Sequence, residues 1–168
     1  LGAAVAAQMI LSGFNPFIAT FVSMIAGMVA GFVTGFLNTK LKIPSLLSGI
    51  LSMTGLYSIN LRIMGKANLP LLKQDTVISI VSDMGIETST AFLIVGIIFV
   101  LIVIAILWWF FGTEKGFAIR ATGDNADMIR ALGVNTNSMV ILGLVISNGL
   151  IALSGGIMAQ YNGYADVG

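Results

Sequence analysis

The side chains that could do chemistry in this sequence are hydroxyls and amides set inside long apolar runs. Residues 43–59 and 137–160 carry them at helical spacing. Ser45, Ser48 and Ser52 fall on one broad face with Asn60, which follows the first run directly, and Ser147 and Ser154 share a stripe of the second run, with Asn148 at its flank. Such groups can exchange hydrogen bonds with a polar solute, which would make these faces the lining of a translocation path. They can equally bond to a neighbouring helix, at about 1 kcal/mol or less per bond. The residues leave both interpretations open, although a helix–helix bond is favoured for Asn148.

Other chemistries are disfavoured by what the sequence lacks. It has no Cys and no His, which removes disulfides, thiolate or imidazole metal sites and Ser-His-Asp catalysis. It has no G-x-x-x-x-G-K-[ST] pattern, so we expect no ATP hydrolysis by this chain alone. A net charge of +1 provides no basic surface for nucleic acid. We therefore expect no catalytic residue, no metal and no cofactor here.

The elements that hold these side chains are expected to be membrane-spanning helices. The sequence is 57% hydrophobic and only 9% charged, against about 25% charged for soluble domains. At about 20 residues per crossing, 168 residues accommodate four or five spans. The prediction is an all-α, polytopic integral membrane helical bundle that forms one domain over residues 1–168, with spans at 1–11 (partial), 17–37, 43–59, 90–111 and 137–160. Because the sequence begins at Leu1 and ends in YNGYADVG, both ends are expected to be truncated.

Three spans carry further signals. Gly27, Gly31 and Gly35 recur every four residues in span 17–37, and this spacing favours close helix packing over a flexible gating segment. Span 90–111 has no polar stripe and is expected to face lipid, with Trp108 and Trp109 at the interface. Residues 154–156 (Ser-Gly-Gly) are expected to bend or break the last helix.

Residues 61–87 carry charges of both signs and are expected to form an external loop. Its charged residues are Arg62, Lys66, Lys73, Asp75, Asp83 and Glu87, and an apolar patch from Val77 to Val81 predicts a short surface segment. The loop is either simply solvated or a contact for a solute-binding protein.

A polar segment at residues 113–136 separates the last two spans. It holds Glu114, Lys115, Arg120, Asp124, Asp127 and Arg130, whereas residues 91–111 and 139–159 hold no charge. Residues 122–125 are helix-starting types, residues 126–132 can form about two turns, and Gly133 suits a C-terminal cap. Met128, Ile129 and Leu132 are expected on one side. The short helix either lies on the lipid headgroups or docks to a protein.

This segment also resembles a known family. Gly116, Arg120, Ala121, Gly123, Asp124 and Asn125, followed by Leu132, Gly133, Val134 and Asn135, look like the cytoplasmic coupling loop of the branched-chain amino acid and ribose type of ABC importer permease. The resemblance extends from about Leu41, through residues 154–156, to residues 160–168, which is about three quarters of the chain.

The resemblance implies the membrane-spanning subunit of an ATP-driven importer in the bacterial inner membrane. It implies an ABC ATPase subunit that holds ATP-Mg, a second permease chain, an extracytoplasmic solute-binding protein and surrounding lipid as partners. The expected ATPase-coupling residues are Gly116, Arg120, Ala121, Thr122, Gly123, Asp124, Asn125, Met128, Ile129, Leu132 and Gly133. The substrate is expected to be a small polar solute such as an amino acid, because residues 163–166 resemble a branch linked to amino acids, aromatic ones included.

The positions of the charged residues predict the orientation of the chain in the membrane and help to judge the alternative functions. Lys40, Lys42, Lys115, Arg120 and Arg130 outnumber Arg62, Lys66 and Lys73, so segment 113–136 is expected in the cytoplasm. The alternative function, an ion-coupled secondary transporter or channel, usually needs charged residues at the membrane midplane, and an intramembrane hydrolase needs paired Asp or Ser and His within spans. The predicted spans contain neither.

Overall fold

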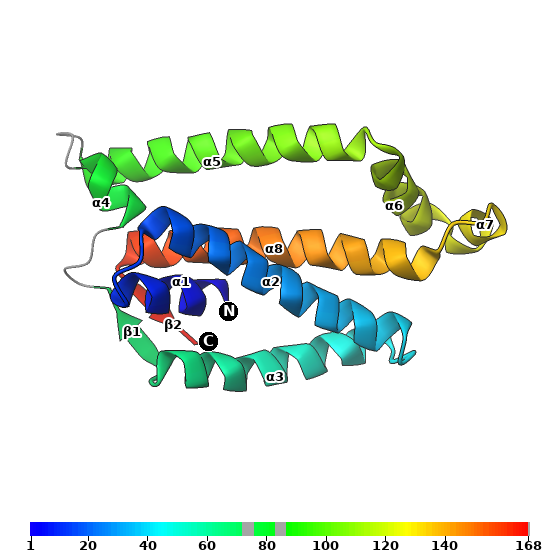
Figure 1. The fold of residues 1–168 in the computed structure, drawn as a ribbon, viewed down its shortest axis with the longest axis horizontal. Coiled ribbons are helices and arrows are strands. Elements are labelled where there is room, and N and C mark those ends of the chain that lie inside the picture. The colour runs from blue at the N-terminus through cyan, green and yellow to red at the C-terminus, as the bar shows by residue number, and fades with distance from the viewer. Residues whose placement is uncertain (72–75, 83–86, 168) are drawn as a thin grey trace.

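The computed structural model describes residues 1–71, 76–82 and 87–167, which form a bundle of helices with one small sheet (Figure 1). The longer helices are α1 (Gly2–Leu11), α2 (Pro16–Thr39), α3 (Ser45–Met64), α5 (Thr88–Phe111) and α8 (Thr136–Asn162). Short helices α4 (Val77–Ser82), α6 (Glu114–Asp124) and α7 (Ala126–Ala131) lie at the two ends of the bundle, and β1 (Asn68–Pro70) pairs antiparallel with β2 (Tyr164–Asp166). The predicted all-α membrane bundle is confirmed.

Three helices of the described chain are long and apolar enough to cross a membrane. They are α2, α5 and α8, with mean hydropathies of 2.0, 3.3 and 2.0. Helix α1 is apolar but only ten residues long. Helix α3 has 20 residues, but its hydroxyls, Asn60 and Arg62 lower its hydropathy, so it is not one of the three. It also runs to Met64, five residues beyond the predicted end.

Local capping chemistry sets the ends of the long helices. Asn15 Oδ1 accepts the Phe17 N–H (2.9 Å) and Pro16 occupies the first helical position, so α2 begins where its unpaired N–H groups have a partner. At the other end of the chain, Asn135 caps α8 through the Ser138 N–H (3.2 Å). Helix α8 ends at Gly163, whose φ of +72° is the left-handed conformation that glycine adopts without strain.

Helices α2 and α8 form the tightest pair in the bundle, and glycines allow their close approach. A Cβ atom on Gly27 would strike Ala152 and the Asn148 carbonyl oxygen, and one on Gly31 would strike the Leu144 carbonyl oxygen. Gly35 lies in the same row against Ile141. The three glycines thus lie on the α8 side of α2, where any side chain would push the backbones apart.

The break expected at residues 154–156 does not occur, because α8 is continuous from Thr136 to Asn162. Gly156 serves close packing instead: a Cβ atom there would lie 2.7 Å from Ser23 Oγ of α2. In a bilayer, a broken helix would expose backbone groups that only an unbroken hydrogen-bond ladder satisfies.

Helix α5 stands apart from the α2–α8 pair along most of its length (Figure 1). Of its residues only Ala91 and Val95 are buried, and Trp108 and Trp109 are 82% and 69% exposed. The helix joins the bundle mainly through α4 at one end and α6 at the other. This placement is what a lipid-facing span with tryptophans near one end requires.

The end of the bundle that holds β1, β2 and α4 differs from the predicted loop. Leu61 to Met64 belong to α3, and residues 164–166 form β2, with Ala165 paired to Leu69. Val77 and Ile78 are buried, so α4 is a packed element and not a surface segment. Its apolar side covers α5 and the end of α8, which removes that surface from solvent. Lys73, Asp75 and Asp83 lie outside the described residues.

Candidate functional site

A cavity of about 480 Å³ lies between α2, α3 and α8. Its lining combines polar and apolar residues: Thr34, Gly49, Ser52, Met53, Leu56, Tyr57, Asn60, Asn148 and Val167. A cavity of this size falls within the range of small-molecule sites. It brings together three of the predicted path residues, Ser52, Asn60 and Asn148, from two helices that are far apart in sequence.

The polar groups of this cavity are only partly satisfied. Thr34 Oγ1 donates to Ser52 Oγ (2.8 Å), which links α2 to α3. Asn148 Nδ2 donates to the Leu144 carbonyl oxygen of its own helix (2.9 Å), so one of its two amide protons remains available. The bond from Asn148 Nδ2 therefore stays within α8 rather than reaching a neighbouring helix. Asn60 is only 7% exposed, and its Oδ1 atom has no hydrogen-bond partner among the described residues.

The remaining predicted path residues lie elsewhere. Ser48 is buried and donates to the Ser45 carbonyl oxygen within α3 (2.9 Å), while the Ser45 side chain is exposed. Ser147 is exposed, because one step along a helix turns a side chain by about 100° away from its neighbour Asn148.

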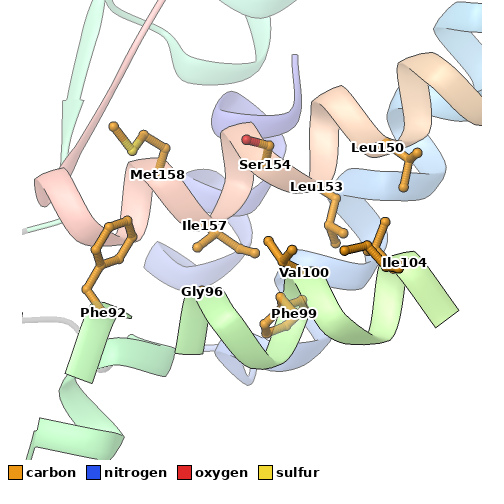
Figure 2. A pocket seen from close by; sticks show the side chains of 11 residues that line it. Phe92, Gly96, Phe99, Val100, Ile104, Leu150, Leu153, Ser154, Ile157 and Met158 are labelled. Carbon is orange, nitrogen blue, oxygen red and sulfur yellow. The ribbon is translucent and has the colours of Figure 1, made fainter. Parts of the chain in front are cut away.

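Ser154 lies on a separate, mostly apolar groove between α8 and α5. This groove has a volume of about 300 Å³. Figure 2 shows Val100 of α5 and Leu153 and Ile157 of α8 projecting between the two helices. The predicted polar stripe of the last span is thus divided between two different surfaces.

Sequence reasoning missed two polar residues of the cavity and one polar residue outside it. Thr34 lies in the glycine-rich span and was given no role there. It follows Gly31 by three residues, so the two residues lie on the same side of the helix. Tyr57 was counted among apolar residues. Gln160 was predicted as the last residue of span 137–160 and was given no role, yet it lies inside α8 and is 4% exposed.

Gln160 connects three helices at the β1–β2 end of the bundle. Its Oε1 atom accepts the Val77 N–H at the start of α4 (2.9 Å). Its Nε2 atom donates to Thr20 Oγ1 of α2 (2.7 Å) and to the Gly156 carbonyl oxygen (3.2 Å). This buried amide holds α4 over the ends of α2 and α8.

At the opposite end, α5 turns sharply into α6. Thr113 caps α6 by accepting the Gly116 N–H (3.4 Å), and a Cβ atom on Gly116 would strike the Phe110 carbonyl oxygen and the Phe111 backbone. Arg120 Nη2 donates to the Phe111 carbonyl oxygen (2.8 Å), and its Cζ atom lies 5.6 Å and 5.2 Å from the ring centroids of Phe111 and Phe117. Arg120 therefore ties α6 back to the last turn of α5.

Helix α7 is likewise anchored at both ends. Asn125 Oδ1 accepts the Met128 N–H (3.0 Å), and Gly133 ends the element at a φ of +86°. Arg130 Nη2 donates to Thr136 Oγ1 at the start of α8 (3.0 Å). The Arg130–Asp127 pair at 3.6 Å is solvent-exposed and contributes little.

Two details of this segment differ from expectation. Thr122, Gly123 and Asp124 end α6 rather than start the next helix, because a helix already begins after the cap residue Thr113, twelve residues before Asn125, which caps α7. Ile129 is buried, whereas Met128 and Leu132 are 58% and 68% exposed. The predicted common apolar side therefore reduces to Met128 and Leu132. Thr122 is buried and Ala121 half-buried, so these two coupling candidates pack inward.

Positive charge gathers at the α6–α7 end. Lys115, Arg120 and Arg130 lie in α6 and α7, and Lys40 and Lys42 lie in the α2–α3 turn at the same end (Figure 1). Arg62 and Lys66 lie at the other end, beside β1. By the positive-inside rule, this distribution of Lys and Arg favours a cytoplasmic position for the α6–α7 end.

Comparison with known proteins assigns the family. The family described as "Branched-chain amino acid transport system / permease component" matches residues 1–168. The chain belongs to this permease family. Together with the apolar helices, membership makes the permease a multi-pass protein of the inner membrane.

Two curated relatives align with nearly the whole permease chain. It is 44% identical over 167 residues to the "Tyrosine transport system permease protein" of Clostridioides difficile (strain R20291), with 99% of this chain and 54% of the relative covered. It is 37% identical over 167 residues to "Uncharacterized protein RP368" of Rickettsia prowazekii (strain Madrid E), with 99% and 57% covered. The chain thus spans about half the length of the curated relatives it matches. No solved structure matches it.

Proposed function

We propose that this permease is the membrane-spanning subunit of an ATP-driven ABC importer and that α6 and α7 form its ATPase-coupling element. The observation that carries the proposal is the attachment of this element. Gly116 and Arg120 fix α6 to the end of α5, and Arg130 fixes α7 to the start of α8. A pull on α7 is thereby transmitted to two long helices at once.

The exposed surface of the element supports docking to a protein. Met128 and Leu132 are four residues apart and both project from α7, and Phe117 is exposed on α6. Three large apolar side chains next to charged residues at the end of a bundle are typical of a protein interface. The partner is an ABC ATPase subunit that holds ATP-Mg and faces the cytoplasm.

Movement of the element reaches α8 by a second route as well. Ile119 of α6 lies against Gly143 of α8, where a Cβ atom would meet the Ile119 methyl at 3.8 Å. When ATP closes the ATPase dimer, the rigid α6–α7 unit tilts α5 and α8 together. The polar cavity on the α2–α3 side of α8 changes shape as a result and passes its solute across the membrane.

The solute proposed for this chain is an amino acid, with tyrosine the first one to test. The support is the relative named as a tyrosine transport system permease, together with a cavity of suitable size that contains hydroxyls and amides. A second permease chain completes the pathway, and an extracytoplasmic solute-binding protein delivers the solute at the β1–β2 end.

The test uses the full-length permease reconstituted in proteoliposomes with its ATPase subunit and its binding protein. We expect uptake of radiolabelled L-tyrosine that requires ATP and survives collapse of the ion gradients. Replacing Met128 and Leu132 by Asp should reduce ATPase retention during purification by at least tenfold, because two charges would be buried at the interface.

The control is Asn137→Asp, which adds one negative charge at an exposed site at the same end of the bundle. It should retain the ATPase. Uptake that continues without ATP and stops when ion gradients collapse would refute the proposal in favour of a secondary transporter.

A further inference from the structure

The cavity between α2, α3 and α8 contains a buried hydrogen-bond acceptor without a partner. Asn60 is 7% exposed, and its Oδ1 atom is unpaired among the described residues. An unsatisfied buried polar atom destabilises a protein. Such an atom beside an open cavity points to a partner that enters the cavity.

The other lining groups define the chemistry of that partner. Ser52, Tyr57 and Asn148 offer hydroxyl and amide groups, and no charged residue lines the cavity in the part of the chain that the structure describes. Neutral groups of this kind suit an uncharged or zwitterionic solute with N–H or O–H donors. They also bind weakly enough to release it, which a translocation path requires.

We propose that Asn60 Oδ1 accepts a hydrogen bond from an N–H or O–H group of the transported solute while the solute occupies this cavity. Ser52 and Asn148 supply further hydrogen bonds from the same cavity. The solute class is a small uncharged or zwitterionic molecule such as an amino acid. The inference rests on the proposed function, but it concerns which residues hold the solute and not how transport is driven.

Accessibility of single cysteines tests occupancy of the cavity directly. Gly49 lines the polar cavity and Gly96 lines the apolar groove between α5 and α8, and a Cβ atom at either site would meet nothing within 4 Å. Gly49→Cys and Gly96→Cys are therefore a matched pair of glycine replacements with room for the new side chain. The reagent is a water-soluble, positively charged methanethiosulfonate, applied to the full complex in a background free of other reactive thiols.

We expect the reagent to modify Gly49→Cys, and saturating L-tyrosine with ATP and binding protein to slow that modification by at least fivefold. Modification of Gly96→Cys should be slow and should not respond to L-tyrosine. Equal rates at Gly49→Cys with and without L-tyrosine would overturn the inference, as would protection at Gly96→Cys alone.

Substitution of the acceptor tests the role of Asn60. Asn60→Leu keeps the approximate size of the side chain and removes Oδ1. We expect the number of L-tyrosine molecules moved per ATP to fall about tenfold, with ATPase retention unchanged. Ser58→Ala, on an exposed position of the same helix that does not line the cavity, should leave this ratio as it is.

The two sets of outcomes separate this inference from the proposed function. Normal uptake by Asn60→Leu overturns the inference while ATP-driven transport stands. If Asn60→Leu does not assemble, Gly49→Cys still tests the inference, because a lack of protection by L-tyrosine would show that the solute does not occupy the cavity. ATP-independent uptake by the unmodified complex refutes the proposed function instead.

Discussion

Arg120 is the residue whose replacement tests the proposed lever most directly. Its guanidinium group donates to the Phe111 carbonyl oxygen at 2.8 Å and lies over two aromatic rings, at 5.6 Å and 5.2 Å from their centroids. The two contacts with Phe111 join α6 to the end of α5, and the contact with Phe117 lies within α6. We expect Arg120→Met to leave membrane insertion unchanged and to loosen this corner, because the long apolar stem remains and every guanidinium contact is lost.

The size of the effect follows from the exposure of Arg120. For an exposed side chain the hydrogen bond contributes about 0.5–1.5 kcal/mol, and cation–π contact at exposed sites adds about 0.5–1 kcal/mol. The corner therefore loses about 1–2.5 kcal/mol of stability, which corresponds to a change of roughly 5- to 70-fold in the ratio of fixed to loosened corner. The number of solute molecules moved per ATP should fall within the same range.

The assay measures uptake and ATP hydrolysis in the same proteoliposomes. Arg120→Lys is the informative companion, because the ammonium group keeps the charge near the rings but lacks the planar fork of the guanidinium. We expect it to retain part of the coupling ratio. The rate of hydrogen exchange at residues 114–124 should be lowest in the wild type, higher in Arg120→Lys and highest in Arg120→Met.

Two results would refute this reasoning. A normal coupling ratio in Arg120→Met would show that the contact with Phe111 is not needed for transmission. Complete loss of ATPase binding in both Arg120→Met and Arg120→Lys, with unchanged hydrogen exchange in α6, would show that Arg120 acts by touching the partner and not by fixing the corner.

Three further substitutions test other parts of the structure. Gly31→Leu should destabilise the α2–α8 pair by about 1–3 kcal/mol or more, because its side chain would meet the Leu144 carbonyl, and a thermal unfolding midpoint equal to wild type would contradict this. Gln160→Leu leaves the buried Val77 N–H without its partner, at about 1–3 kcal/mol, whereas the Thr20 hydroxyl keeps its bond to the Pro16 carbonyl oxygen, so hydrogen exchange in α4 should accelerate while α8 stays protected. Gly133→Trp places a bulky residue at a φ of +86°, at about 1–2 kcal/mol, so transport per ATP should fall while membrane insertion, followed by protease protection, stays normal.

The positions of several helix ends, and which end of the bundle carries more Lys and Arg, could be predicted from the sequence, because both depend on local residues. Positions of turns and caps such as Asn15 and Gly133 follow from residues within one helical turn, and the all-α membrane class follows from composition. The start of α6 at Glu114 was missed, because a segment rich in charge and glycine also fits an irregular loop, and only the corner formed with Phe110 and Phe111 stabilises it as a helix.

Which polar residues meet was decided only by the tertiary structure. The sequence determined that α3 and α8 carry hydroxyls and amides in apolar surroundings, and that three glycines permit close approach of α2 to a neighbour. It did not determine the rotation of α8 about its axis, which depends on how α2 packs against Gly149 and Gly156. Since adjacent residues differ by about 100°, that rotation placed Asn148 in the cavity with Asn60 and left Ser147 outside it.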